Sequence, residues 1–215
     1  MYENARKGLG KIYTAEILTI FVVIIGIVSA VILVVLGKVL KSDGASVNTA
    51  DVVSFVSMLV ALVLGIVSFF LNLFGIISAS KDDEGFKNAL YMVIIGIIAS
   101  IVASILKTKH PTIAGYFETI NDVSELFVFY YVISGCVNIA RAKKNDALVA
   151  TGNRTKVIII VIWVISLVLN FFKGSLEAKG TVGGIFTAIA IIGGIASIVS
   201  YILYLVILRK TINTI

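Results

Sequence analysis

Four hydrogen-bonding side chains lie well inside apolar stretches of this chain and could together contact a ligand. They are Asn72, Tyr131, Ser134 and Asn138. The last three recur at steps of three and four residues, which places them on one face of a helix. Amide and hydroxyl groups form hydrogen bonds without carrying a fixed charge, so the set suits a neutral or zwitterionic polar ligand. The alternative is that they only hydrogen-bond neighbouring helices, each bond contributing about 0.6 kcal/mol in a membrane.

Residues that could catalyse a reaction or bind a metal ion lack the spacing that such chemistry requires. The one histidine, His110, stands beside the one proline, Pro111, and there is no His-Glu-x-x-His or Cys-x-x-Cys pattern. Residues 81–85 include three acids without the alternating ligands of a calcium loop, and we interpret them as a solvated turn. The sequence therefore predicts no metal ion, no cofactor and no enzymatic activity.

The elements that must position these side chains are six long apolar stretches separated by short polar connections. They cover residues 15–37, 52–78, 88–106, 122–140, 157–172 and 184–208. A helix needs roughly 20 residues to cross a hydrocarbon core about 30 Å thick. Charged residues make up 14% of the chain and hydrophobic residues 59%, whereas a soluble domain is about 25% charged. We predict an all-α fold, a polytopic transmembrane helix bundle with six spans.

The distribution of basic residues predicts the orientation of the bundle, because Lys and Arg are retained on the cytoplasmic side during insertion. One alternate set of connections, together with the two chain ends, contains twelve basic residues, and the other set contains six. The larger set includes all four arginines, which are Arg6, Arg141, Arg154 and Arg209. We therefore expect both termini in the cytoplasm. This topology accounts for the net charge of +6, so nucleic-acid binding is not needed to explain it.

We expect a single six-helix transmembrane domain at residues 15–208, a cytoplasmic lead-in at 1–14 and a cytoplasmic tail at 209–215. The apolar run of the first span exceeds twenty residues, longer than the 7–15 of a typical signal peptide, so we interpret it as uncleaved. Apolar residues of the lead-in recur at helical spacing, which is typical of an amphipathic segment at the headgroups. A frayed extension of the first helix is the alternative.

Small residues predict which helix faces pack, because they allow the close backbone approach that drives association in lipid. On the second span they recur at steps of three or four and so share one side of the helix. This stripe consists of Ser54, Ser57, Ala61, Gly65, Ser68 and Gly75, with Asn72 on the same side. Gly96 and Gly193 mark shorter stripes on the third and sixth spans. We expect these faces to contact other helices.

A weak internal repeat links the second and fourth spans. Residues 69–81 align without gaps on residues 129–141, matching an aromatic pair, a glycine and a terminal cation. A duplicated helical hairpin would produce such a parallel repeat. Chance similarity between two apolar sequences is the alternative.

These patterns favour a non-enzymatic module, embedded in a bacterial plasma membrane, that associates with itself or with another membrane protein. Membrane lipids are its other expected partner. The alternative is a solute-binding or solute-translocating subunit that depends on a separate energising partner, an analogy from length and span count. A water-filled polar cavity lined by the second and fourth spans would favour this alternative, and a dry, interdigitated bundle would favour the interaction module.

Overall fold

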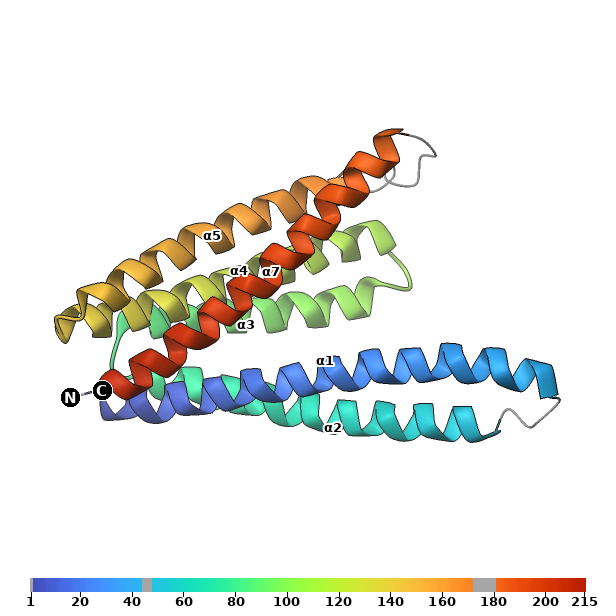
Figure 1. Ribbon diagram of the computed structural model, residues 1–215. Helices are drawn as coiled ribbons and strands as arrows, with labels where there is room; N and C mark the ends of the chain where they lie inside the picture. The colour runs from blue at the N-terminus through green and yellow to red at the C-terminus, as the bar shows by residue number, and fades with distance from the viewer. Residues whose placement is uncertain (1, 44–47, 172–180) are drawn as a thin grey trace. The chain divides into compact units, whose positions relative to one another are not determined.

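A computed structural model of the chain describes residues 2–43, 48–171 and 181–215, with side chains for 2–32, 52, 55–165 and 192–215 (Figure 1). The described residues contain six helices and no strand. The helices are α1 (Glu3–Asp43), α2 (Asn48–Ala79), α3 (Glu84–Leu106), α4 (Pro111–Ala142), α5 (Asp146–Phe171) and α7 (Thr181–Thr214). The structure thus confirms the all-α fold.

Each of these six helices includes a stretch that is long and apolar enough to cross a membrane. The stretches are 20 to 32 residues long, and their mean hydropathy lies between 1.5 and 2.7. The chain is therefore an integral membrane protein with a transmembrane helix bundle. All six helices begin before the predicted spans, and α1, α4 and α5 begin more than ten residues earlier. α1 is continuous from Glu3, so the lead-in is part of the first helix. α4 begins at Pro111; proline lacks a backbone N–H, but the first N–H groups of a helix form no hydrogen bond within it.

Contacts within the chain divide it into two units. Unit 1 contains Met1–Gly10 and Ile76–Ile215, and unit 2 contains Lys11–Gly75. The central helix of unit 1 is α4, which packs against α3, α5 and α7 and most extensively against α3 (Figure 1). In an 18-residue apolar window of α4, 44% of the residues are buried inside the chain, against 22% or less in the corresponding window of each of the other five helices. The α3–α4 pair is therefore the best-packed part of unit 1.

Four segments of unit 1 meet at one end of its helices, which we call the basic end. They are the first residues of α1, the turn before α3, the turn between α4 and α5, and the last residues of α7 (Figure 1). The largest fully buried side chains of unit 1 gather toward this end; they include Leu9, Ile76, Phe86, Ile133, Ile139, Tyr204, Ile207 and Leu208. The turn between α3 and α4 lies at the opposite end.

Candidate functional site

The turn that precedes α3 is hydrogen-bonded to the start of α1. The carboxylate of Asp82 accepts a bond of 2.9 Å from the Asn4 amide and one of 2.7 Å from the backbone N–H of Ala5. The hydroxyl of Ser78 donates to the Asn4 carbonyl at 3.1 Å. The first N–H groups of a helix have no partner within that helix. Asp82 therefore caps α1 from a position 77 residues away along the chain.

The next residue joins α3 to α4. Asp83 is the N-cap of α3, and its side chain accepts a bond of 2.7 Å from the backbone N–H of Gly85. The same oxygen accepts a bond of 3.2 Å from the side-chain amide of Asn138 on α4. A carboxylate at an N-cap accepts a hydrogen bond from an otherwise unpaired N–H, and its negative charge interacts favourably with the positive end of the helix dipole.

The two aspartates have pKa values shifted in opposite directions. Burial raises the pKa of Asp83, and the hydrogen bonds from Gly85 and Asn138 oppose this only in part. Burial also acts to raise the pKa of Asp82, but the hydrogen bonds from Asn4 and Ala5 outweigh it and lower the pKa. We interpreted residues 81–85 as a solvated turn; the structure has a turn at residues 80–82, in which Lys81 is exposed, and the two aspartates are partly exposed and hydrogen-bonded. Apart from Gly85, their partners Asn4, Ala5 and Asn138 lie 55 to 78 residues away along the chain, too far for local spacing to reveal them.

Glycines allow the helices to approach closely just inside the basic end. A Cβ atom built on Gly135 would lie 2.7 Å from ring atoms of the fully buried Phe86, and one on Gly85 would lie 2.5 Å from the Gly135 nitrogen. A Cβ atom on Gly152 of α5 would overlap the Val137 side chain. The sequence analysis did not single out these glycines. The alignment of Gly135 with a glycine of α2 in the internal repeat was the available signal.

The predicted ligand-binding residues fall in both units. Asn72 belongs to unit 2, and Tyr131, Ser134 and Asn138 belong to α4 in unit 1. The Asn72 amide donates to the Glu16 carboxylate at 3.0 Å, within unit 2. Asn138 bonds to Asp83 as described above. Both amides thus have structural partners, as the interhelical alternative requires.

The other two predicted residues form local contacts on α4. The hydroxyl of Ser134 donates to the backbone carbonyl of Tyr130, one helical turn earlier, at 2.9 Å. The ring of Tyr131 stacks on Phe127 and meets the ring of Tyr130 edge-on. Neither contact joins α4 to another helix, and a ligand at this face stays a prediction.

The residues expected to pack have different surroundings. Ser68 is buried, and its hydroxyl lies 2.8 Å from the Ala15 carbonyl and 2.8 Å from the Thr19 hydroxyl. Gly75 is also buried. At Gly96, an added Cβ atom would lie 3.3 Å from the Asn121 side-chain oxygen, so α3 approaches α4 closely there.

The remaining small residues are less enclosed. Ser57, Ala61, Gly65 and Gly193 are half-buried, whereas the side chain of Ser54 lies outside the described residues. Among the residues that the structure describes, no heavy atom outside the local backbone lies within 4 Å of a Cβ atom built on Gly65. The stripe of α2 is thus packed near Ser68 and Gly75 and open at Gly65.

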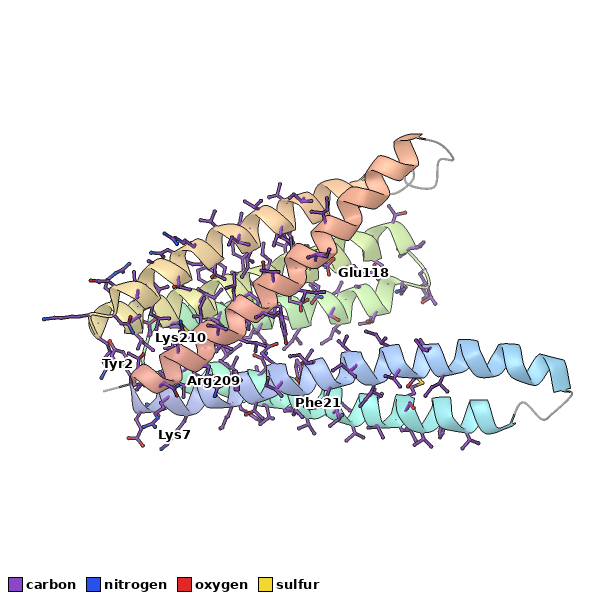
Figure 2. All side chains as sticks on the ribbon, viewed as in Figure 1. Tyr2, Lys7, Phe21, Glu118, Arg209 and Lys210 are labelled. Carbon is purple, nitrogen blue, oxygen red and sulfur yellow. The ribbon has the colours of Figure 1, made fainter. Side chains whose placement is uncertain are left out.

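A polar cleft of about 280 Å³ lies between α3 and α4, away from the basic end. It is lined by Ser100, Ala103 and Ser104 of α3, by Lys107 directly after α3, and by Glu118, Asn121 and Asp122 of α4. The Lys107 ammonium lies 3.1 Å from the Glu118 carboxylate. Figure 2 shows Glu118 near the end of unit 1 that is opposite Arg209 and Lys210. The sequence analysis missed this cleft because it placed residues 107–121 in a connection.

The spacing of the polar residues on α4 could have revealed the cleft. Glu118 lies three residues before Asn121 and four before Asp122, so the three share one face of a helix. Within the described parts of the chain, no group of three His, Cys, Asp or Glu residues is arranged to hold a metal ion. The side chains that line the cleft can offer hydrogen bonds and charge to a ligand.

Comparisons with known proteins returned no match. No family model, no curated protein and no solved structure matches this chain at a significant level.

Proposed function

We propose that this protein is a non-enzymatic membrane-embedded module that associates with a second copy of itself through α2. The observation that carries the proposal is the open part of the small-residue stripe. Ser57, Ala61 and Gly65 repeat at every fourth residue, which is the small-xxx-small spacing that lets two transmembrane helices approach closely.

The surroundings of this stripe support a helix as its partner. Gly65 has room for a Cβ atom among the described residues, so nothing described there fills the space that its missing side chain leaves. Large side chains flank the stripe and are exposed, including Met58 (69%) and Leu62 (54%). A stripe bordered by such residues forms a shallow groove, and two copies related by a twofold axis bring identical grooves together.

Hydrogen bonds between polar groups support a structural role for the rest of the chain. Ser68 and Asn72 hydrogen-bond to α1, Asn138 bonds to Asp83, and Asp82 caps α1. Such bonds hold helices in place, and they occupy the same donors that a ligand would need.

We further propose that the module lies in the plasma membrane of a bacterium with both termini in the cytoplasm. The twelve-to-six distribution of basic residues supports this orientation. The grouping of the chain ends with two turns at the basic end of unit 1 supports it as well.

Disulfide crosslinking in native membranes tests the self-association. In a Cys136→Ser background, Gly65→Cys should form a covalent dimer under mild oxidation. Val63→Cys is the matched control, because Val63 lies on the opposite side of α2 and is 56% exposed. Equal dimer yields from the two variants, or a crosslink from Gly65→Cys to a different protein only, would contradict self-association.

Solute binding is a second candidate function, and the cleft between α3 and α4 favours it. The expected cavity was one lined by the second and fourth spans, whereas this cleft is lined by the third and fourth. Titration of the purified protein with small polar solutes tests this candidate. Binding that survives replacement of the cleft residues would exclude the cleft as the site.

A further inference from the structure

We infer that the cleft between α3 and α4 binds a primary ammonium group. The inference gives a ligand class to the second candidate function, and it does not depend on self-association through α2. It follows from the charge of the cleft, from its hydrogen-bonding groups and from its size.

The charged side chains of the cleft leave one negative charge in excess. Lys107 supplies one positive charge, and Glu118 and Asp122 supply two negative charges. The Lys107 ammonium is paired with Glu118 at 3.1 Å. Asp122 forms no ion pair with any residue that the structure describes. A cationic ligand can therefore pair with Asp122 without displacing Lys107 from Glu118.

The end of α3 adds to this preference. α3 ends at Leu106, within one turn of Ser104, and the C-terminal end of a helix carries a partial negative charge that favours cations. The Lys107 ammonium already interacts with this partial negative charge. A second cation would be drawn to Asp122, on the α4 side of the cleft.

The cleft presents several acceptors beside the Lys107–Glu118 ion pair. The hydroxyl of Ser104 uses its proton to bond to the Ser100 carbonyl at 2.9 Å, so its oxygen is left as an acceptor. The Asn121 amide oxygen and the Asp122 carboxylate are further acceptors in the same lining. A primary ammonium group has three N–H donors and no acceptor, so it matches this set better than a carboxylate or a neutral carbonyl compound does.

The size of the cleft limits the ligand to a small group. Its volume of about 280 Å³ lies just below the 300–1,000 Å³ that is usual for drug-sized ligands. A free alkylamine has a suitable size, and so does the ethanolamine headgroup of a phospholipid, which shares the primary ammonium. The cleft lies near the end of two apolar helices, a position that both kinds of ligand could reach.

Titration of the full chain with ethanolamine tests the inference. The protein is held in phosphatidylcholine nanodiscs, and binding is followed by ligand-observed NMR, with propionate as the anionic probe of similar size. Ethanolamine should bind and propionate should not. Asp122→Asn should weaken ethanolamine binding by about tenfold or more, the usual loss for a hydrogen bond to a charged group. Glu84→Gln is the control, because it removes an exposed carboxylate from the other end of α3.

A second variant has the opposite expected effect. Lys107→Gln removes the positive charge that neutralises Glu118, so the cleft becomes more negative and ethanolamine binding should tighten several-fold. If Asp122→Asn fails to fold, Ser104→Leu provides a steric test, because Ser104 is exposed and a larger side chain there would fill the cleft. Weaker ethanolamine binding in Lys107→Gln, or unchanged binding in both Asp122→Asn and Ser104→Leu, would overturn the inference.

Lipid composition distinguishes the two sources of the ammonium group. Binding of free ethanolamine in phosphatidylcholine discs supports a soluble amine. Stabilisation by phosphatidylethanolamine over phosphatidylcholine that disappears in Asp122→Asn, without binding of free ethanolamine, supports the lipid headgroup. The absence of both ethanolamine binding and phosphatidylethanolamine stabilisation would overturn the inference. Dimer crosslinking through Gly65→Cys would be unaffected by this result.

Discussion

Replacing Gly135 by alanine should destabilise the protein by overpacking the contact between α3 and α4. The new Cβ atom would lie 2.7 Å from two atoms of the Phe86 ring and 2.8 Å from a third. Carbon atoms in favourable contact are about 3.5–4.0 Å apart, so the ring would have to move by roughly 1 Å. Phe86 is fully buried, and its movement would displace its neighbours. Insertion of this kind usually costs about 1–3 kcal/mol.

Gly115→Ala is the matched control on the same helix. Among the described residues, no heavy atom outside the local helix backbone lies within 4 Å of a Cβ atom built there. Alanine favours a helix over glycine by about 1 kcal/mol, and this gain applies to both substitutions. It cancels in the difference between the two variants, which therefore isolates the overpacking energy of about 1–3 kcal/mol.

Reversible unfolding in mixed detergent micelles measures this difference. Gly135→Ala should unfold at lower denaturant than Gly115→Ala, and adding Phe86→Leu to Gly135→Ala should recover part of the loss, because the ring is then absent. Such non-additivity is typical of residues in contact. Equal stability of the two alanine variants would refute the close crossing of α3 and α4 at Gly135.

Three further predictions concern charge, burial and orientation. Folding raises the pKa of Asp83 above its ordinary value of 3.8, so the native state binds more protons at this carboxyl than the unfolded state does. The free energy of unfolding of wild type should therefore fall as the pH rises above 3.8. Asp83→Asn should remove this fall. Folding lowers the pKa of Asp82, so this carboxylate contributes stability at neutral pH that is lost as the pH falls through its pKa in the folded protein. Asp82→Asn should therefore be less stable than wild type at neutral pH only. Unfolding midpoints measured against pH check both aspartate variants. Cys136 is fully buried, so a water-soluble maleimide should modify it only after unfolding, as mass spectrometry would show. In a Cys136→Ser background, an impermeant thiol reagent should label Thr112→Cys in sealed cells but not Asn145→Cys, and labelling of the latter would reject the cytoplasmic assignment.

The sequence predicts the helices well because crossing a membrane requires long apolar runs, and those runs are visible in the chain. It places the start of α4 too late, near Asp122, because the preceding helical turns carry Glu118 and Asn121. Polar residues near the end of a span resemble a connection when only hydropathy is considered. The spacing of Glu118, three residues before Asn121 and four before Asp122, was the signal that a helix continued through them.

The polar contacts of the basic end could not be predicted in the same way. Helical spacing assigns a residue to a face, but it does not identify the partner of that face. Asn138 was predicted to share a face with Ser134, which follows from periodicity alone, whereas its bond to Asp83 spans 55 residues. The bond between Asp82 and Asn4 spans 78 residues. Only the fold brings such pairs together.

The structure adds one parallel to the internal repeat. Ser78 of α2 and Asn138 of α4 occupy aligned positions in the repeat. Each donates a hydrogen bond to the beginning of the preceding odd-numbered helix: Ser78 to the Asn4 carbonyl of α1, and Asn138 to the Asp83 N-cap of α3. Two hairpins with the same closing contact are what a duplication would produce, and the repeat stays a prediction.

Energy transfer between labelled copies in a lipid bilayer tests the proposed self-association. The full chain, labelled at its N-terminus with a donor or an acceptor dye, is diluted with lipid at fixed dye ratio, for wild type and for Gly65→Ile. We expect wild-type transfer above the level of random proximity, falling as lipid is added, and loss of this excess in Gly65→Ile, because the β-branched side chain holds two α2 helices apart. Transfer at the random level in wild type, or the same dilution curve for both proteins, would contradict association through the α2 stripe.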